Sequence, residues 1–376
     1  MKTFTTKLKL LTAVGVISTS AFAQGDMSTF LQAGANDGTK ILNAYASPLL
    51  KSFGAGLNGG WFNSAKVHGI GGFSLTVSPN IAFAPAADQE FNVNALGLSS
   101  STRVINGKTV SPTIFGASED ANNPEIGMFA RYPGATQDSM LTSFKLPPGI
   151  GVNLFPVPTA QLAVGVGLGT EVAIRFLPTI KSGEFEIGMF GFAVKHDIKQ
   201  WFKGIKEMPF DLSVMAGYTQ LDASLKLKEL KGDPESSQTH NPNPGKAYNQ
   251  SVEFTSSAYT FNAIISKKLS VFTPYLGLGF QGATTKLGLK GDYPLTDLNS
   301  TYDPNQPTTG SNKPKTVKEL KDPVNLEGSI GGFRATAGFR LKLAVITIHA
   351  DYTFAEYNVA SIGIGLHLQS IAPFKL

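Results

Sequence analysis

Long stretches of the chain alternate between apolar and polar residues with a period of two. Between Phe333 and Leu343 every second side chain is apolar or small, whereas Arg334, Arg340 and Lys342 share the opposite face. The same alternation recurs in four further segments, 210–219, 257–266, 344–354 and 361–369. Because successive side chains of a β-strand point to opposite faces, the pattern predicts strands whose two faces meet different surroundings.

The polar face of these strands favours a membrane barrel over a secreted β-sandwich, which would also alternate. It is rich in Gly, Ser and Thr instead of Lys and Glu, and the strands reach the roughly 9–11 residues that a tilted membrane-spanning strand needs. Tyrosines lie near the expected strand ends, where an interfacial girdle would place them: Tyr218, Tyr259, Tyr275, Tyr352 and Tyr357. In lipid only a closed barrel satisfies all backbone groups of a sheet, so we expect an all-β, closed antiparallel transmembrane barrel.

The lengths of the connections support the same interpretation, because such barrels have short periplasmic turns and longer external loops. Counted back from a periplasmic C-terminus, the link at 355–358 and the long polar stretches 291–327 and 231–250 fall outside. The turn at Leu343 and the short segment 266–270 fall inside. Five consecutive connections therefore fit one orientation.

The first half of the chain defines fewer strands. "GVGLG" predicts a hairpin that turns at 167–170, and Asn106-Gly107 is a type I′ hairpin signal that we place in an external loop. The region 91–148 shows little regular pattern, and the sum is roughly 12–14 strands, with an even number expected. The expected divisions are a signal peptide (1–23), an N-terminal plug or mouth seal (24–66) and the barrel (67–376).

Two segments show helical spacing instead of alternation. In 24–66, Tyr45, Leu49 and Phe53 recur at helical intervals, and a glycine-rich stretch with Trp61 follows. This segment is expected to act as a plug in the lumen or a seal across the periplasmic mouth, or only to stabilise the first strands. In 195–208, Trp201 and Phe202 lie between lysines, which predicts a short amphipathic helix at the membrane surface or a cap on the barrel mouth.

Composition and charge describe an exported chain. Only 16% of the 376 residues are charged, and there is no cysteine for a disulfide or a thiolate metal site. Three lysines, the apolar run 10–16 and "AFAQ" predict a signal peptide cleaved after Ala23. Removing these lysines lowers the net charge of +5 by three to +2, and no basic run indicates nucleic-acid binding. No later apolar stretch is long enough for a transmembrane helix.

Candidate chemistry is confined to the polar side of the predicted strands. We expect six residues to line the lumen: Arg334, Arg340, Lys342, His349, Asp351 and His367. A buried, unpaired arginine would be unstable, so we expect Asp351 or a plug residue to pair with one of the arginines. The five histidines show no metal-ligand spacing, so we expect no metal site, no cofactor and no enzymatic activity. A barrel-wall hydrolase that uses His349 and Asp351 remains an alternative.

Several blocks together resemble a family of exported, uncharacterised proteins from Bacteroidetes: "GAGLNGGWFNSAKVHGIGGFSLTVS", "GTEVAIRFLP", "FGFAVKHDIKQW", "PFDLSVMAGY", "FTPYLGLGF" and "RATAGFRLKLAVITIHADYTF". The resemblance spans nearly the whole chain after the signal peptide but implies no activity or site residues. An N-terminal plug before a barrel is also similar in architecture to the long-chain fatty-acid transporter family. "SIGIGLHL" is similar to the final strand of outer-membrane barrels, although eight residues, Gln369 to Leu376, follow it.

These observations lead to one hypothesis and two rivals. We expect a barrel in the cell outer membrane for passive permeation or uptake of a small molecule. A hydrophobic molecule is one option for this substrate. Its expected partners are the lipid bilayer, lipopolysaccharide and that small molecule, with no nucleic acid and no protein partner identified. The rivals are a non-transporting scaffold that binds partners through 231–250 and 291–327, and the barrel-wall hydrolase.

Overall fold

The computed structural model describes most of the chain. The described residues are 35–119, 122–131, 136–227, 236–246, 248–299, 301–303 and 305–369. The expected signal peptide (1–23) and the first part of the expected plug (24–34) lie outside them. Within these described ranges, no helix is long and apolar enough to cross a membrane.

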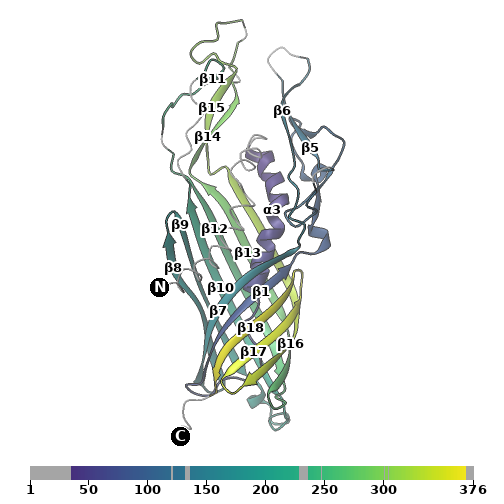
Figure 1. The fold of residues 1–376 in the computed structure, drawn as a ribbon, viewed down its shortest axis with the longest axis vertical. Helices are drawn as coiled ribbons and strands as arrows, with labels where there is room; N and C mark the ends of the chain where they lie inside the picture. The colour runs from purple at the N-terminus through teal and green to yellow at the C-terminus, as the bar shows by residue number, and fades with distance from the viewer. Residues whose placement is uncertain are drawn as a thin grey trace, which may run out of the picture.

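Ten antiparallel strands close into a barrel (Figure 1). Around the wall they are β1 (Phe73–Phe83), β18 (Asn358–Leu368), β17 (Ile346–Phe354), β16 (Val324–Leu343), β13 (Phe272–Lys290), β12 (Ser251–Ser266), β10 (Asp211–Lys226), β9 (Phe185–Asp197), β8 (Thr170–Ser182) and β7 (Leu154–Gly167). The predicted fold class is confirmed. The expected count of roughly 12–14 strands is wrong, because the strands among the described residues of 84–153 are three to seven residues long, which is too short to cross a bilayer.

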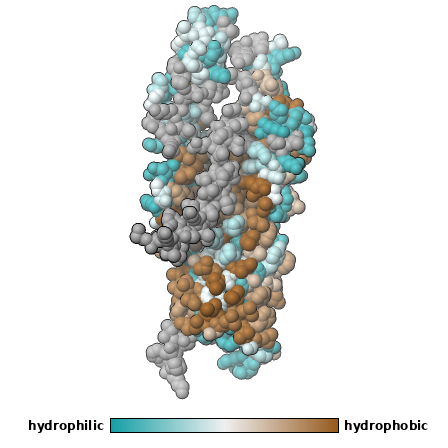
Figure 2. All heavy atoms as spheres, viewed as in Figure 1, coloured by the Kyte–Doolittle hydropathy of each residue, from teal (hydrophilic) through white to brown (hydrophobic). Residues whose placement is uncertain are grey.

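The barrel is apolar outside and polar inside. On β16, Phe333 is 56% and Phe339 is 39% exposed, whereas Arg334 and Arg340 are 2% and 6% exposed. The same division follows β18, where the residues from Ile362 to Leu368 alternate between exposed apolar and buried positions. In Figure 2, apolar residues form a broad belt across the lower half of the face shown. A closed sheet with such a belt is a transmembrane β-barrel whose outer face meets lipid.

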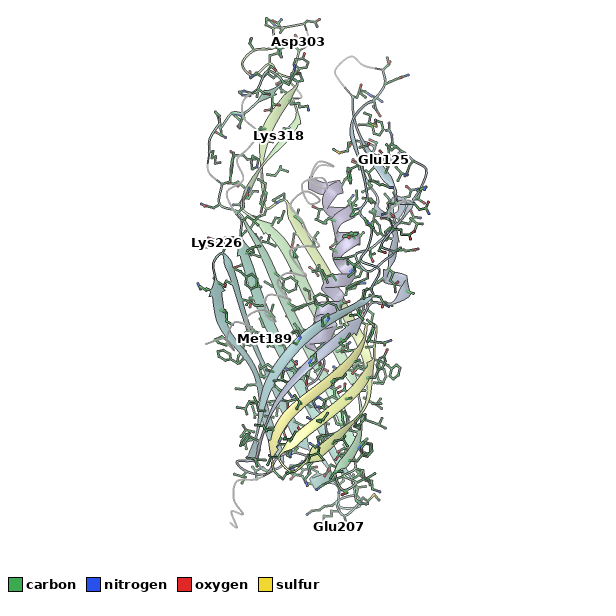
Figure 3. All side chains as sticks on the ribbon, viewed as in Figure 1. Glu125, Met189, Glu207, Lys226, Asp303 and Lys318 are labelled. Carbon is green, nitrogen blue, oxygen red and sulfur yellow. The ribbon has the colours of Figure 1, made fainter. Side chains whose placement is uncertain are left out.

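The two ends of the barrel differ, as the connection lengths predict. We call one the turn end; its connections are 168–169, 198–210, 267–271 and 344–345. The other is the loop end, where long connections leave the wall. Figure 3 marks Glu207 at the turn end and Asp303 at the far tip of the loop end.

The predicted amphipathic helix at the turn end is wrong. Residues 198–210 contain a single 3-10 turn, η3 (Lys199–Trp201), followed by further turns. Hydrogen bonds tie the segment to the strand ends, since the Ile198 N–H donates to the Leu212 oxygen (3.2 Å). Trp201 and Phe202 are nevertheless 70% and 53% exposed, so their apolar rings lie on the surface.

Two structures extend from the loop end. The loop lobe (84–153) contains β2 (Glu90–Asn92) paired with β4 (Val110–Pro112), and β5 (Glu125–Ala130) between β3 (Thr102–Val104) and β6 (Ser139–Lys145), with the turns η1 (Ala86–Asp88) and η2 (Val93–Leu96). The loop arm joins β14 (Asp292–Leu298), β15 (Lys315–Lys321) and β11 (Thr239–His240). The predicted hairpin at Asn106-Gly107 is wrong, because β3 and β4 pair with β5 and β2 instead of each other.

Helix α3 (Ala35–Leu57) lies within the barrel and rises between the loop lobe and the extended ends of β13 and β16 (Figure 1). Near the loop end, Ile41 and Leu42 pack in one apolar cluster with Phe144 of the lobe and Leu326 of β16. The helix continues through Pro48. Beyond Leu57, residues 58–72 cross the lumen to β1, so the N-terminal plug-like segment of the predicted fold is confirmed.

Candidate functional site

One arginine of the wall holds the plug where its helix ends. Arg175 of β8 is fully buried, and its guanidinium donates to the main-chain oxygens of Leu57 (2.7 Å) and Gly59 (2.6 Å). It also donates to Gln161 Oε1 (3.2 Å) and lies 3.6 Å from the centre of the Trp61 ring. The last carbonyls of a helix have no helical partner and carry partial negative charge. Arg175 therefore stabilises the end of α3 in this position.

Two further arginines bind the descending part of the plug. Arg334 Nη1 donates to the Asn58 oxygen (2.9 Å) and to Thr260 Oγ1 (3.0 Å). Arg340 Nη1 donates to Asn63 Oδ1 (3.2 Å). Because these plug atoms accept hydrogen bonds from buried cations, the plug is part of the electrostatic balance of the lumen. The contacts agree with the prediction that a plug residue pairs with a lumen arginine.

A buried polar chain fastens the plug again near the turn end. Glu171 of β8 accepts hydrogen bonds from the ring and the main-chain N–H of His68, at 2.5 and 3.1 Å, and pairs with Lys195 Nζ at 3.0 Å. The other ring nitrogen of His68 lies 3.1 Å from His367 Nδ1. The residue after β18, Gln369, donates to the Val67 oxygen (3.0 Å). Lys195 of β9 also donates to the Ser64 oxygen (3.4 Å), so β8, β9 and β18 are all bonded to the plug.

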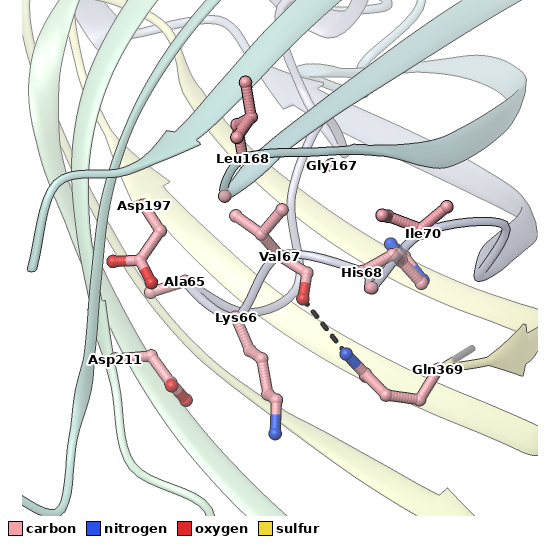
Figure 4. Close-up of a pocket in the computed structure, with 12 residues that line it drawn as sticks. Ala65, Lys66, Val67, His68, Ile70, Gly167, Leu168, Asp197, Asp211 and Gln369 are labelled. Carbon is pink, nitrogen blue, oxygen red and sulfur yellow. Dashed lines mark hydrogen bonds between the residues drawn. The ribbon is translucent and has the colours of Figure 1, made fainter. Parts of the chain in front are cut away.

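A hollow of about 310 Å³ opens beside this chain at the turn end (Figure 4). Lys66, Asp197 and Asp211 are among its lining residues, so charges of both signs meet in it. The plug residues 65–70 form one side of the hollow.

The wall of the barrel is interrupted between β7 and β8. The two strands pair only from Gln161 opposite Arg175 down to Gly167 opposite Thr170. Both strands continue toward the loop end, yet residues 154–160 pair only with β1. In β8, residues 176–177 and 180–182 pair only with β9, and a register shift leaves Pro178 and Thr179 between them without a strand partner. In Figure 1 the β8–β9 hairpin spreads away from β7 and β1 above this point. The break begins at the rung formed by Gln161 and Arg175.

The backbone direction of β7 shows which atoms face the break. The Gly165 N–H donates to the Gly72 oxygen (2.8 Å) on the β1 side. Backbone groups of successive strand residues point alternately to the two neighbouring strands, so even-numbered residues of β7 face β8. Pro156 and Pro158 are two of these residues, and proline has no N–H to donate. The edge of β7 along the break is therefore poor in donors.

The opposite edge carries a matching proline. Continuing the register of Gln161 and Arg175 would place Pro158 opposite Pro178 of β8. Both residues would occupy a position that requires each to donate a hydrogen bond, and neither can. The seam between β7 and β8 consequently cannot extend past this pair. The break is encoded in the sequence.

Apolar side chains line the interior beside the break. Val157, Met189 and Leu221 belong to one buried cluster there, and Figure 3 marks Met189 on β9. Five half-buried side chains pack against this cluster along the same part of the lumen: Phe53, Phe155, Leu177, Ile187 and Phe254. The ring centre of Phe53 lies 6.2 Å from that of Phe155 and 4.8 Å from that of Phe254. The lumen is thus apolar next to the break and polar between Arg175 and the turn end.

The family model for proteins of unknown function called DUF6588 matches residues 1–368. The chain belongs to this family. No curated protein sequence matches it. The match agrees with the resemblance to a family that has no established activity, and the closed barrel with its apolar belt makes the molecule an outer-membrane β-barrel.

Solved structures of outer-membrane proteins match with low similarity. Ail, the attachment invasion locus protein of Yersinia pestis, is 8% identical and has a TM-score of 0.24, over 80% of this chain and 98% of Ail. The translocator domain of the autotransporter NalP from Neisseria meningitidis is 11% identical, with a TM-score of 0.26, over 89% of this chain and 99% of its own. A Pseudomonas aeruginosa FadL homologue is 10% identical, with a TM-score of 0.22, over 80% and 90%. Scores this low carry no argument about the function of this chain.

The structure places the expected lumen residues in different surroundings. Arg334, Arg340, His349, Asp351 and His367 are buried on the inner face of the wall. Lys342 lies half-buried at the turn end. These residues do not form one cluster, because Arg334 and Arg340 bind different parts of the plug, whereas His367 belongs to the chain with His68.

The expected plug residues are spread along the plug. Tyr45 donates to the Pro148 oxygen of the loop lobe (2.9 Å), and Leu49 and Phe53 pack in the apolar interior. Trp61 stacks on Arg175. Gly217 gives the Trp61 ring room, because a Cβ at Gly217 would lie 3.2 Å from it.

Sequence reasoning missed the most extensive contact with the plug. Arg175 alternates with exposed Ile174 and Phe176, and it shares the inner face with Glu171. A strict reading of "TEVAIRF" with a period of two would have found both residues as candidates. It would not have found their partners, because Leu57 lies 118 residues away from Arg175 in the sequence.

The arrangement around His349 does not assemble a catalytic triad in the part of the chain that the structure describes. One ring nitrogen of His349 lies 3.3 Å from Ser78 Oγ. The Asp351 carboxylate accepts a hydrogen bond from the Tyr275 hydroxyl (2.9 Å) instead of orienting His349. Among the described residues, no group of three or more potential ligands could hold a metal ion.

Proposed function

We propose that the protein is a passive path for uptake of a small hydrophobic molecule across the outer membrane, gated by the plug. The observation that carries this proposal is the break between β7 and β8, which opens beside an apolar part of the lumen. Export of the chain and removal of residues 1–23 as a signal peptide belong to the same proposal.

The physical reason is the match of polarity on the two sides of the break. An apolar molecule in the membrane loses favourable burial if it enters a wet, polar pore. Passing between the edges of β7 and β8, it exchanges lipid for Phe155, Leu177 and Ile187. Arg175 and Trp61 then close the way toward the turn end. Transfer across the membrane therefore requires the plug to move.

The test closes the break by restoring hydrogen-bond donors. In the double variant Pro158→Val/Pro178→Val, the register of Gln161 and Arg175 can continue, and valine favours strands. We expect uptake of an uncharged fluorescent hydrophobic probe by cells that express the protein to fall roughly tenfold. The matched control is Pro274→Val in β13, where the proline lies opposite Phe339 in a continuous seam.

Closure is measured separately from uptake. The chain has no cysteine, so the pair Ala160→Cys/Phe176→Cys reports on the first unpaired rung alone. This pair should cross-link faster in the double-valine background than with both prolines present. If cross-linking shows closure and uptake stays at the level of the Pro274→Val control, the proposed path is refuted.

The size of the loop lobe and loop arm favours a second function as a surface scaffold. Both structures extend well beyond the wall at the loop end (Figure 1). Deletion of 301–313 from the loop arm distinguishes the two functions. A scaffold would lose a co-purifying partner, whereas uptake through the break should continue unchanged.

A further inference from the structure

A second hollow at the turn end differs in charge from the one in Figure 4. It has a volume of about 320 Å³ and is lined by Lys268, Ser270, Val271, Lys342 and Ala344. It lies between the β12–β13 turn and the β16–β17 turn, which are joined by a hydrogen bond from the Lys342 N–H to the Val271 oxygen (2.8 Å). Its shape depends on Ser270 and Ala344, whose φ angles are +57° and +55°.

Positive charge gathers at this hollow without a compensating carboxylate in its lining. Lys342 lies close enough to Arg340, Lys268 and Lys66 for their charges to act on it. Asp211 acts on Lys66 and Arg340, but it lines the other hollow. Within the described residues, neither Lys268 nor Lys342 makes an ion pair. An anion would therefore bind at these two ammonium groups.

The hollow lies at the edge of the apolar belt. Val271, Leu343 and Val345 around it are 49%, 53% and 46% exposed. Just farther along the wall, the outward rings of Phe272 and Phe339 lie side by side with centres 5.7 Å apart and planes tilted by 30°. Charged side chains next to such a boundary lie at the depth of lipid headgroups, and the aromatic rings beyond them lie against acyl chains.

We propose that this hollow binds the phosphate group of a membrane phospholipid. The ammonium groups of Lys268 and Lys342 neutralise the phosphate, and the hydroxyl of Ser270 is available as a further donor. The acyl chains lie over Phe272 and Phe339. Free inorganic phosphate shares the headgroup chemistry but gains nothing from the rings. The site does not depend on the proposed uptake function.

The test measures lipid binding by native mass spectrometry on the full chain, purified in detergent and stripped of lipid. Titrated with dioleoylphosphatidylglycerol, the variant Lys268→Ala/Lys342→Ala should bind roughly 30-fold more weakly than the wild type. The control Lys203→Ala/Lys206→Ala removes the same charge from the 198–210 segment at the same end and should change binding by less than about twofold. Dioleoylglycerol, which lacks phosphate, should not distinguish the variants.

Each contrary result overturns the proposal. Equal binding by Lys268→Ala/Lys342→Ala and the wild type excludes the site. An equal loss in the control variant shows diffuse attraction to basic charge. Displacement of the lipid by an equal concentration of inorganic phosphate shows a site for free phosphate. Folding is checked by heat-modifiable gel migration. If the double variant does not fold, Lys268→Glu on the exposed turn replaces it, and it should lose more lipid affinity than the double variant.

Discussion

Replacing Arg175 by methionine should release the plug. The change removes the donors to the oxygens of Leu57 and Gly59 and the stacking on Trp61, while it keeps an unbranched side chain of similar length. The two carbonyls would remain buried without their partner. Because Arg175 is the charged group of the described wall that is hydrogen-bonded to these two oxygens, we expect the plug to open more often.

The magnitude follows from these contacts. Two hydrogen bonds from a charged donor contribute about 1.5–3 kcal/mol each, and a desolvated cation–π contact contributes about 2 kcal/mol. Burying a guanidinium without a carboxylate costs several kcal/mol, and the variant no longer bears that cost. The net weakening of plug docking is therefore about 2–4 kcal/mol. At the lower bound the open population rises roughly 30-fold.

Cysteine labelling measures this population. Ser52 of α3 is fully buried, and Ser52→Cys is a small change in a chain that has no cysteine of its own. When opening is fast relative to labelling, the reaction rate with a water-soluble maleimide is proportional to the open population. Arg175→Met should raise that rate at least roughly 30-fold.

A matched variant separates plug release from a general effect on β8. Lys181→Met removes a cation from the same strand, but its side chain is 71% exposed and pairs only with Glu186. It should leave the labelling rate within about twofold of the parent. If Arg175→Met also stays within that range, Arg175 does not hold the plug and the reasoning fails.

Two further predictions concern packing and pH. A Cβ at Gly277 would lie 2.6 Å from the Phe62 ring, so Gly277→Ala should destabilise the plugged barrel by about 1–3 kcal/mol and lower the temperature of heat-modifiable migration. In the control Gly288→Ala the nearest atom to the new Cβ lies 3.6 Å away, so that temperature should not fall. In the loop arm, hydrogen bonds led by the one from Lys246 hold the pKa of Glu319 below its usual range. A depressed pKa means that the contact stabilises the arm above the unfolded pKa and is lost as pH falls through the folded pKa. The protection of the arm's amides against exchange, corrected for the intrinsic exchange rate at each pH, should therefore fall as the pH drops below the ordinary pKa of a glutamate, about 4.3. Lys246→Met should flatten that dependence, and a corrected protection that does not change with pH in the wild type would contradict it.

The wall could be predicted because its signal is local. In β16 and β18 the polarity of each residue indicates the side of the sheet on which its side chain lies. Alternation alone therefore predicts the lipid face and the lumen face. The lengths of the connections also predict which end of the barrel carries the long loops. The helical spacing in α3 and the lack of alternation in that segment likewise indicate an element that does not belong to the wall.

What could not be predicted depends on partners far apart in the sequence. Asn106-Gly107 has the chemistry of a hairpin turn, but the strands on its two sides, β3 and β4, pair with β5 and β2. The local signal therefore predicted the wrong pairing. The spacing of Trp201 and Phe202 suits a helix, yet the segment between β9 and β10 forms only the 3-10 turn η3 and further turns. The break between β7 and β8 could be predicted only in part. Its prolines are visible in the sequence, but only the register, continued beyond Gln161 and Arg175, would place Pro158 opposite Pro178.

The position of the plug also links the two ends of the chain. Helix α3 precedes β1 in the chain, and the barrel closes where β1 meets β18, its first and last wall strands. Residues 58–72 cross the lumen and join the helix directly to β1. The strand that carries the plug is thus one of the two strands that close the wall. Docking of the plug and pairing of β1 with β18 therefore both depend on where β1 lies, although the plug and β18 come from opposite ends of the chain.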